Sequence, residues 1–324
     1  SYSCRRLDIE GNDWIAPSPV NELIPGAEIH YWFEALDGVG TPSVFPADAP
    51  DAYYEISILP ISATVGDPGI LLVDKHGRRT PSAARDYFHS SEYYYREMLG
   101  ILGYEWETYD VEVPSGSTNQ SNGPDSAGYK YYDTQIWFTD EFDAYTIKAP
   151  DQARLIDWLA QAGEGKERNL LITGNDWGKE LEVDGKETLF FYETWMASDF
   201  VQNSVGSVTV DSLPGIKDAG NGFMTHDDGE AILRGGCPQL HYYDVVDADP
   251  GLPGVAVILN YEKLDTTELP AGTYYTNPTL GYQTVNLGFG MEFISDGTVD
   301  GGASNYSGGG GSGAGGYFKI GVED

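Results

Sequence analysis

The sequence predicts an α/β protein, with a parallel sheet flanked by helices behind an N-terminal all-β portion. Residues 1–62 contain aromatic-rich stretches that alternate polar and apolar side chains with period two, which is typical of half-buried strands. From residue 66 onward, short apolar runs alternate with helix-length segments. That rhythm indicates βαβ units, whose strands lie parallel in one sheet.

In the N-terminal portion, strands are expected at residues 27–35 and 53–60, separated by the proline-rich residues 41–50. The pattern resembles the last strands of an immunoglobulin-like or fibronectin-like sandwich. Seven strands do not fit in about 60 residues, so the sandwich is either incomplete or completed by another segment. Unpaired strand edges attract further strands, so self-association is one expectation for such a module.

Residues 66–297 form the predicted α/β domain. The first helix starts after Ser90 or Ser91 and stops at Gly103, and the second starts at Pro150 and stops at Gly163. Residues 189–196 form a further expected helix, and residues 211–253 are rich in turns. Residues 298–324 form a glycine-rich linker and a terminal strand. Strands are expected at residues 70–74, 104–111, 133–139, 169–173, 205–210, 255–259 and 283–289.

The segment GNDWG at residues 174–178 directly follows the buried strand expected at residues 169–173. A strand that ends in G-x-D-x-G is the outline of a nucleophile elbow, in which acyl-transfer enzymes place Ser or Cys. This chain has Asp176 there. We expect its side chain to cap the following helix. Alternatively, Asp176 is the nucleophile of a hydrolase, with Asp74 nearby and a base supplied by His226 or His241.

Several of these segments resemble the class I glutamine-amidotransferase-like (flavodoxin-like) fold, in the form found inside large secreted bacterial proteins. They are the strand ending in Asp74, the tyrosine-rich helix after it, the strand at residues 132–137 and the elbow, together with residues 236–238 and 287–292. The likeness covers about residues 65–297. It implies a flavodoxin-like parallel sheet, an extracellular location and neighbouring Ig-like modules.

The chain departs from the family at the catalytic positions. The family's nucleophilic Cys falls in the elbow, where this chain has Asp176. The family's His-x-Glu pair follows the last strand, where this chain has the sequence GME at residues 290–292 and no His. The resemblance therefore implies a pseudoenzyme scaffold that does not hydrolyse glutamine and has no catalytic residues or bound cofactor.

The charge balance excludes some partners. The chain has 51 acidic and 18 basic residues, a formal charge of −33, which repels nucleic acids and anionic membrane surfaces. No apolar run approaches the roughly 20 residues of a membrane-spanning helix. Calcium is the cation that acidic loops could bind, although none has the EF-hand spacing and solvated turns are the alternative. The candidate ligands are Asp227, Asp228, Asp247 and Asp249.

Other sequence features leave alternatives open. Cys4 and Cys237 form one long-range disulfide or remain two buried thiols. Asn119 and Asn305 begin glycosylation sequons. The seven tryptophans offer a sugar-binding platform, although core packing explains most of them. Because the N-terminus lacks both Met and an apolar leader, we expect a processed piece of a longer precursor.

These observations favour a non-catalytic, extracellular structural or adhesive module of a larger secreted or cell-surface protein. Its expected partners are other modules of the same precursor, identical subunits, or glycans. The first alternative is the hydrolase that uses Asp176. The second is a calcium- or carbohydrate-binding module.

Overall fold

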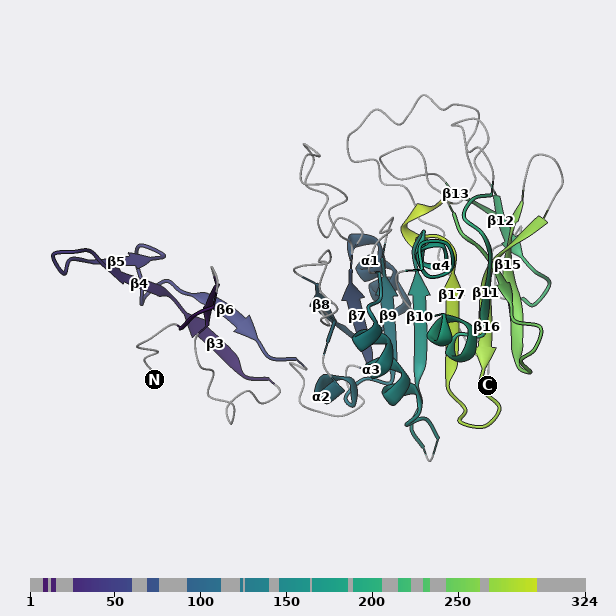
Figure 1. Ribbon diagram of the computed structural model, residues 1–324, viewed down its shortest axis with the longest axis horizontal. Helices are drawn as coiled ribbons and strands as arrows, with labels where there is room; N and C mark the ends of the chain where they lie inside the picture. The colour runs from purple at the N-terminus through teal and green to yellow at the C-terminus, as the bar shows by residue number, and fades with distance from the viewer. Residues whose placement is uncertain are drawn as a thin grey trace, which may run out of the picture. The chain divides into compact units, whose positions relative to one another are not determined.

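The chain divides into two compact units, Ser1–Thr64 and Val65–Asp324. A computed structural model provides the coordinates (Figure 1). The structure describes residues 8–10, 13–15, 26–59, 69–75, 92–111, 123–124, 126–139, 146–163, 165–185, 189–205, 215–222, 230–233, 243–262 and 268–295.

Antiparallel strand pairs make up the described part of the N-terminal unit. The strand expected at residues 27–35 is in fact two strands, because the chain changes partners at Trp32. Each sheet described here has two strands, so the Ig-like sandwich stays a prediction. The pairs are β1 (Asp8–Glu10) with β2 (Asp13–Ile15), β3 (Glu28–Tyr31) with β6 (Tyr54–Ser57), and β4 (Phe33–Leu36) with β5 (Pro42–Phe45).

A ten-stranded mixed sheet organises the second unit. Its parallel half has the order β8-β7-β9-β10-β17. Numbered along the chain, this order is 2-1-3-4-5, the order of flavodoxin-like doubly wound folds. The sequence therefore predicted this half of the sheet correctly. Its strands are β7 (Ile70–Asp74), β8 (Trp106–Asp110), β9 (Thr134–Phe138), β10 (Asn169–Thr173) and β17 (Gln283–Leu287).

The other half of the sheet is antiparallel and continues from β17 in the order β16-β15-β12-β13-β18. The sequence predicted a parallel sheet, and the observed sheet is mixed, with a parallel half and an antiparallel half. Only residues 263–267 join β15 to β16, and so short a connection closes a hairpin but cannot make a parallel crossover. The strands are β12 (Gly215–Asp218), β13 (Glu230–Leu233), β15 (Val255–Glu262), β16 (Glu268–Thr276) and β18 (Ile294–Ser295).

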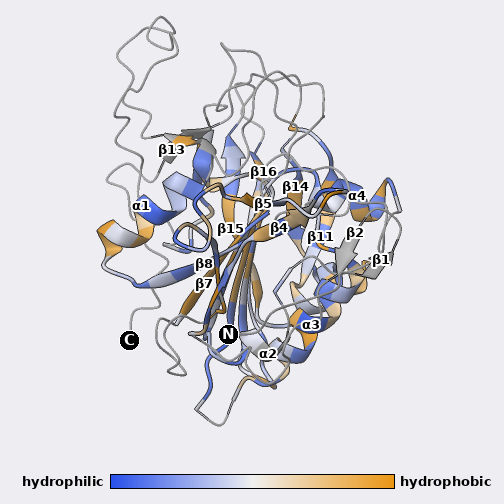
Figure 2. Cartoon of the chain, turned by 90° about the vertical axis from the view of Figure 1, so that its left-hand side faces the viewer, coloured by the Kyte–Doolittle hydropathy of each residue, from blue (hydrophilic) through white to orange (hydrophobic). Residues whose placement is uncertain are grey.

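Helices cover both faces of the parallel half. Figure 2 shows α1 (Glu92–Leu102) on one side of the sheet, with α2 (Ser126–Tyr129) and α3 (Ala149–Leu159) on the other. None of the described helices is both long and apolar enough to cross a membrane. The remaining elements are α4 (Trp177–Glu182), the π-helix η1 (Phe191–Trp195), the 3-10 helix η2 (Met291–Phe293) and a two-stranded sheet of β11 (Ser198–Gln202) and β14 (Val245–Ala248).

The core lies between the sheet and these helices. Apolar residues gather on the central strands in Figure 2, and buried side chains from the parallel and antiparallel halves belong to one cluster. Tyr95 of α1 stacks on Phe138 of β9 with ring centroids 4.2 Å apart. On the other face, α3 buries Leu155 and Trp158. Burial of each large apolar side chain contributes about 1.5–3 kcal/mol, so this cluster fixes the carboxyl edge of the sheet in place.

Candidate functional site

The elbow after β10 has the geometry of a strand-to-helix corner. Thr173 ends the strand, and α4 begins at Trp177. Between them, Asp176 has φ 62° and ψ 2°, in the left-handed region. That conformation costs a non-glycine residue about 1–2 kcal/mol, so the surrounding contacts must hold it. The strand, turn and helix expected from the G-x-D-x-G pattern are all present.

Gly178 lets three elements approach the elbow closely. A Cβ atom at this position would lie 2.5 Å from Cδ2 of Phe200, 3.0 Å from the hydroxyl oxygen of Tyr192 and 3.1 Å from Oδ2 of Asp244. Such distances are too short for non-bonded atoms, so any side chain here would push its neighbours away. The second glycine of the motif is therefore a packing requirement of this corner.

Asp244, and not Asp176, caps α4. Its Oδ2 atom accepts hydrogen bonds from the backbone N–H groups of Gly178 at 2.8 Å and Lys179 at 3.3 Å. The prediction that the Asp176 side chain caps the helix is wrong, because α4 has no side-chain cap bond from that residue. An N-cap residue usually has extended backbone, which points its side chain at these N–H groups. The left-handed backbone of Asp176 does not point its side chain at the N–H groups of α4.

The carboxylate of Asp176 lies instead in a buried polar cluster. When the Asn203 amide is oriented to satisfy its neighbours, its nitrogen donates to Oδ1 of Asp176 at 2.7 Å and to Oδ1 of Asp244 at 3.2 Å. The ammonium of Lys179 lies 3.9 Å from Oδ1 of Asp176. Asp176 is 3% exposed and Asp244 is 1% exposed. One amide therefore bridges two buried carboxyl groups.

Burial gives these two carboxyl groups an unusual electrostatic environment. Loss of hydration raises the pKa of Asp244 well above its ordinary value, and the charge of Asp176 raises it further. The N–H groups of Lys179 and Gly178 offset part of this effect. Burial, followed by the charge of Asp244, also raises the pKa of Tyr192. Asp244 therefore keeps its proton over a pH range in which an exposed aspartate has lost it.

Buried polar groups surround the same corner. Among the residues that the structure describes, both side-chain amide atoms of Asn175 and the indole nitrogen of Trp177 have no hydrogen-bond partner. These two residues flank Asp176. The hydroxyl of Tyr192 interacts with the side chain of Asn286, which offsets part of the rise that burial causes in the pKa of Tyr192. A buried polar atom without a partner costs about 1–3 kcal/mol, so the described contacts leave part of the cost of burying Asn175 and Trp177 uncompensated.

Asp74 belongs to a different part of the carboxyl edge. It is fully buried at the end of β7, and β9 separates that strand from β10. Two strand spacings amount to about 10 Å, so the structure does not bring Asp74 to the elbow. Carboxylate oxygens of Asp74, Asp110 and Glu92 lie within 4.8 Å of one another. Asp74 and Asp110 make further contacts, and three carboxylates alone do not identify a ligand.

The segment after β17 is fastened to both β10 and α1. The hydroxyl of Thr173 donates to the carbonyl of Phe289 at 2.7 Å and accepts from the N–H of Met291 at 3.0 Å. Glu292 accepts a hydrogen bond from the Tyr95 hydroxyl at 2.6 Å. Burial and the Glu292 charge raise the pKa of Tyr95 well above its ordinary value. The glutamate in the position of the family's His-x-Glu pair is therefore bound to a tyrosine.

Two of the expected calcium ligands lie at the strand β14: Asp247 is within it, and Asp249 directly follows it. Asp247 lies opposite Asp199 of β11, and Asp249 accepts from the N–H of Gly251 at 2.7 Å in a turn. Burial, with the charges of Asp247 and Asp249, raises the pKa of Asp199. In the described part of the chain, neither Asp247 nor Asp249 belongs to a cluster of side chains spaced to bind a metal ion. A loop calcium site formed by these two aspartates is thus not supported.

The other predicted site residues lie outside the described residues. They are His226, His241, Asp227, Asp228, Cys4, Cys237, Asn119 and Asn305. The sequence did not indicate that Asn203 and Tyr192 pack against the elbow. It also did not indicate that Asp244 caps α4. No local signal marks them, because Gly178 and Asp244 are 66 residues apart in the chain.

Comparisons with known proteins give only distant structural likenesses. No protein-family model matches the chain, and no curated protein sequence matches it. A β-galactosidase from Rahnella sp. R3 aligns with a TM-score of 0.42 and 10% identity over 71% of this chain and 30% of the other. A GH42 β-galactosidase from G. stearothermophilus gives 0.41 and 11%, over 68% of this chain and 27% of the other. The glutaminase domain of Trypanosoma brucei CTPS gives 0.36 and 11%, over 70% of this chain and 86% of that domain.

Proposed function

We propose that this chain is a non-catalytic structural or adhesive module of a larger extracellular protein. The observation that supports this most strongly is the state of Asp176. At the position where elbow enzymes expose their nucleophile, its carboxylate is 3% exposed and contacts Asn203 and Lys179. A nucleophile must reach its substrate, whereas a buried carboxylate engaged with its neighbours contributes only to the fold.

The N-terminal unit is the part of the chain that we assign to adhesion. Its short strands carry exposed aromatic side chains, with exposed fractions of 45% at Trp32, 56% at Phe33 and 61% at Phe45. Each sheet among the described residues of this unit has two strands, and an unpaired edge of such a sheet accepts a further strand. Other modules of the same precursor or identical subunits are the partners that this surface favours, and glycans are a further class that its aromatic rings suit.

A hydrolase is the second candidate, and the elbow itself favours it. The left-handed backbone of Asp176 is the conformation that exposes a nucleophile in related corners. Burial raises the pKa of Asp244 and so keeps a protonated carboxyl group beside Asp176 over a wider pH range than an exposed aspartate would. In this hypothesis Asp176 attacks the substrate and forms an ester, and the protonated Asp244 donates its proton to the leaving group. The base that activates water to cleave the ester remains the histidine expected from the sequence, His226 or His241.

An activity assay with matched variants separates the two candidates. The wild-type chain, Asp176→Asn and the control Asp157→Asn, which changes an exposed residue of α3, are assayed on chromogenic esters, amides and glycosides. The structural proposal predicts no turnover above background for any of them, together with concentration-dependent association of the wild type in sedimentation velocity. Turnover by the wild type and Asp157→Asn that disappears in a folded Asp176→Asn protein would establish the hydrolase instead.

A further inference from the structure

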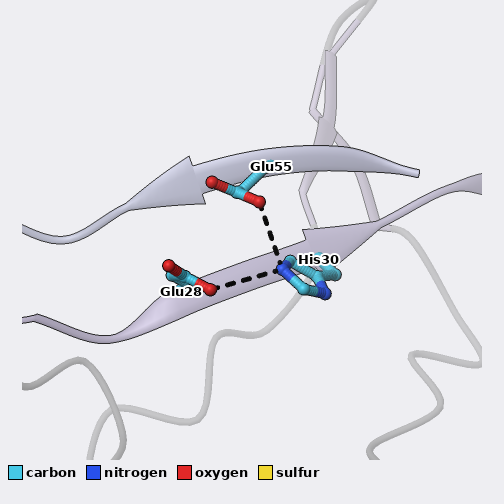
Figure 3. Close-up of side chains that lie close together, drawn as sticks. All are labelled: Glu28, His30 and Glu55. Atoms are coloured by element: carbon cyan, nitrogen blue, oxygen red, sulfur yellow. Dashed lines mark ion pairs between the residues drawn. The ribbon is translucent and has the colours of Figure 1, made fainter. Parts of the chain in front are cut away.

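We propose that Glu28, His30 and Glu55 form a Zn²⁺ site on the N-terminal unit (Figure 3). The topology explains why they meet. Glu28 and His30 are two residues apart on β3, so their side chains leave the same face of the strand. Glu55 of β6 lies directly opposite His30 in the antiparallel register. One face of this two-stranded sheet therefore presents one imidazole and two carboxylates together.

The spacing of the donor atoms fits a shared cation. Nε2 of His30 lies 3.3 Å from Oε2 of Glu55 and 3.7 Å from Oε2 of Glu28. In a tetrahedral zinc site with bonds of about 2.0–2.2 Å, ligand atoms are separated by about 3.4 Å. Direct charge-assisted hydrogen bonds are shorter, at about 2.7–2.9 Å. Both nitrogen–oxygen distances are therefore closer to the separation of ligands on one zinc ion than to a direct hydrogen bond, and the two carboxylate oxygens lie within 4.8 Å of each other.

The imidazole is also oriented before any ion binds. The ring of Tyr53 stacks on His30 with centroids 3.9 Å apart and planes 15° from parallel. This contact fixes the plane of the imidazole, and Figure 3 shows its nitrogen facing both carboxylates. A ligand whose orientation is set by a neighbouring group loses less freedom when the metal binds.

The donor set selects the class of metal. Calcium and magnesium prefer oxygen ligands alone, whereas an imidazole combined with carboxylates suits Zn²⁺ and similar transition-metal ions. Two carboxylates on a chain with a formal charge of −33 favour a divalent cation electrostatically. Three protein ligands leave one tetrahedral position for water. This site is separate from the elbow, and its existence does not depend on the proposed function.

The rival explanation is a surface ion pair. The side chains of His30, Glu28 and Glu55 are 39%, 62% and 49% exposed, and a protonated histidine between two exposed glutamates needs no metal. Such pairs are common and contribute about 0–1 kcal/mol. The two explanations differ in one measurable respect, because only the metal site binds Zn²⁺ through the His30 ring.

Calorimetric titration of the metal-free full chain with Zn²⁺ at pH 7.5 tests the proposal. His30→Gln and Glu55→Gln each remove a ligand, whereas Glu34→Gln removes an exposed carboxylate of the neighbouring strand β4 and is the matched control. We expect one binding event whose affinity falls by about tenfold or more in both ligand variants and is unchanged in the control. Equal isotherms for wild type and His30→Gln would overturn the site.

A second readout makes the test independent of other zinc-binding groups. The imidazole proton resonances of His30 are identified by their absence from the NMR spectrum of His30→Gln. They should shift or broaden when Zn²⁺ is added to the wild type, and Ca²⁺ at the same concentration should leave them unchanged. If Zn²⁺ leaves these resonances in place, the cluster is only an ion pair. Because all three positions are exposed, the circular dichroism of each variant is expected to match the wild type.

Discussion

The two halves of the ten-stranded sheet differ in how clearly the local sequence identifies their strands. In the parallel half, β7 and β10 each contain four consecutive buried residues, and short apolar runs in the sequence identify these strands. In the antiparallel half, β12 and β13 are four-residue strands of mixed composition, and β16 contains a proline. Parallel strands are covered on both faces and therefore carry a local signal. Antiparallel strands of this kind depend on partners that are distant in the sequence.

The halves meet where β16 pairs with β17, and Gly288 extends this junction beside the elbow. The N–H of Gly288 donates to the carbonyl of Ala271 in β16 at 3.0 Å, and its own carbonyl accepts from the N–H of Asp244 at 2.9 Å. Asp244 in turn caps α4 of the parallel half. The comparison therefore teaches that the locally encoded half supplies the corner. The groups that stabilise it, Asp244 and Asn203, come from the ends of the separate β11-β14 pair, whose strands are distant in the sequence.

The largest effect is expected from Gly288→Ala, which acts at this junction. A Cβ atom there would overlap the backbone carbonyl of Asp244, and backbone atoms cannot rotate away as a side chain can. We expect a loss of about 3 kcal/mol in the free energy of unfolding, measured by urea denaturation.

Gly100→Ala is the matched control for that variant. Gly100 is exposed in α1, and a Cβ there meets only ring atoms of Trp106 at 3.7 and 4.0 Å. Because alanine favours a helix, this substitution is expected to stabilise the protein by about 0.5–1 kcal/mol. Equal destabilisation by both changes would mean that Gly288 is not a junction between the two halves.

A smaller effect distinguishes the two carboxyl groups of the elbow. Asp244→Ala removes the acceptor of two backbone N–H groups, at Gly178 and Lys179, and is expected to cost about 2 kcal/mol. Asp176→Gly removes a side chain but also relieves the left-handed strain, worth about 1–2 kcal/mol. We therefore expect it to stay within about 1 kcal/mol of the wild type.

Chemical denaturation of both variants measures this difference. A ranking in which Asp176→Gly is the more destabilising change would show that Asp176 supports the corner more than Asp244 does. That result would also weaken the assignment of the helix cap to Asp244.

The sequence predicts the strand–turn–helix corner but not the side chains that pack against it. The elbow is visible because its strand, glycines and aspartate are consecutive, so a short pattern contains all of them. Asn203 and Asp244 reach the same corner from β11's end and the start of β14, and their approach depends on the pairing of those strands. Composition at residues 211–253 indicates turns, and nothing local indicates that Asp244 will be buried against α4.

Strand register limits the sequence prediction elsewhere. The strands near His30 and Glu55 were expected, but their alignment was not, and a shift of one residue would move these side chains to opposite faces. In β16, Pro270 lowers the expectation of a strand because proline cannot donate to the sheet. The structure accommodates it opposite Asn260, where the register with β15 is irregular.

The smallest predicted effect tests whether the two elbow carboxyl groups interact through charge. The folded-state pKa of Asp244 is raised, so the folded chain keeps a proton that the unfolded chain loses as the pH rises through the ordinary carboxyl value of 3.8. The contribution of Asp244 to folding stability therefore decreases with rising pH from that value until the folded-state pKa is passed. Asp176→Asn removes the neighbouring charge and is expected to lower the folded-state pKa of Asp244. The pH range over which Asp244 destabilises the fold then becomes narrower.

Urea denaturation at pH 4, 5.5 and 7 measures this difference. The wild type is expected to lose more stability across this range than Asp176→Asn, because the charge of Asp176 raises the folded-state pKa of Asp244 further than burial alone. Asp157→Asn removes an exposed charge of the same type and should retain the wild-type slope. If Asp176→Asn also retains it, burial alone sets the pKa of Asp244. Asp244 would then stabilise the corner by hydrogen bonding to the N–H groups of α4, without electrostatic coupling to Asp176.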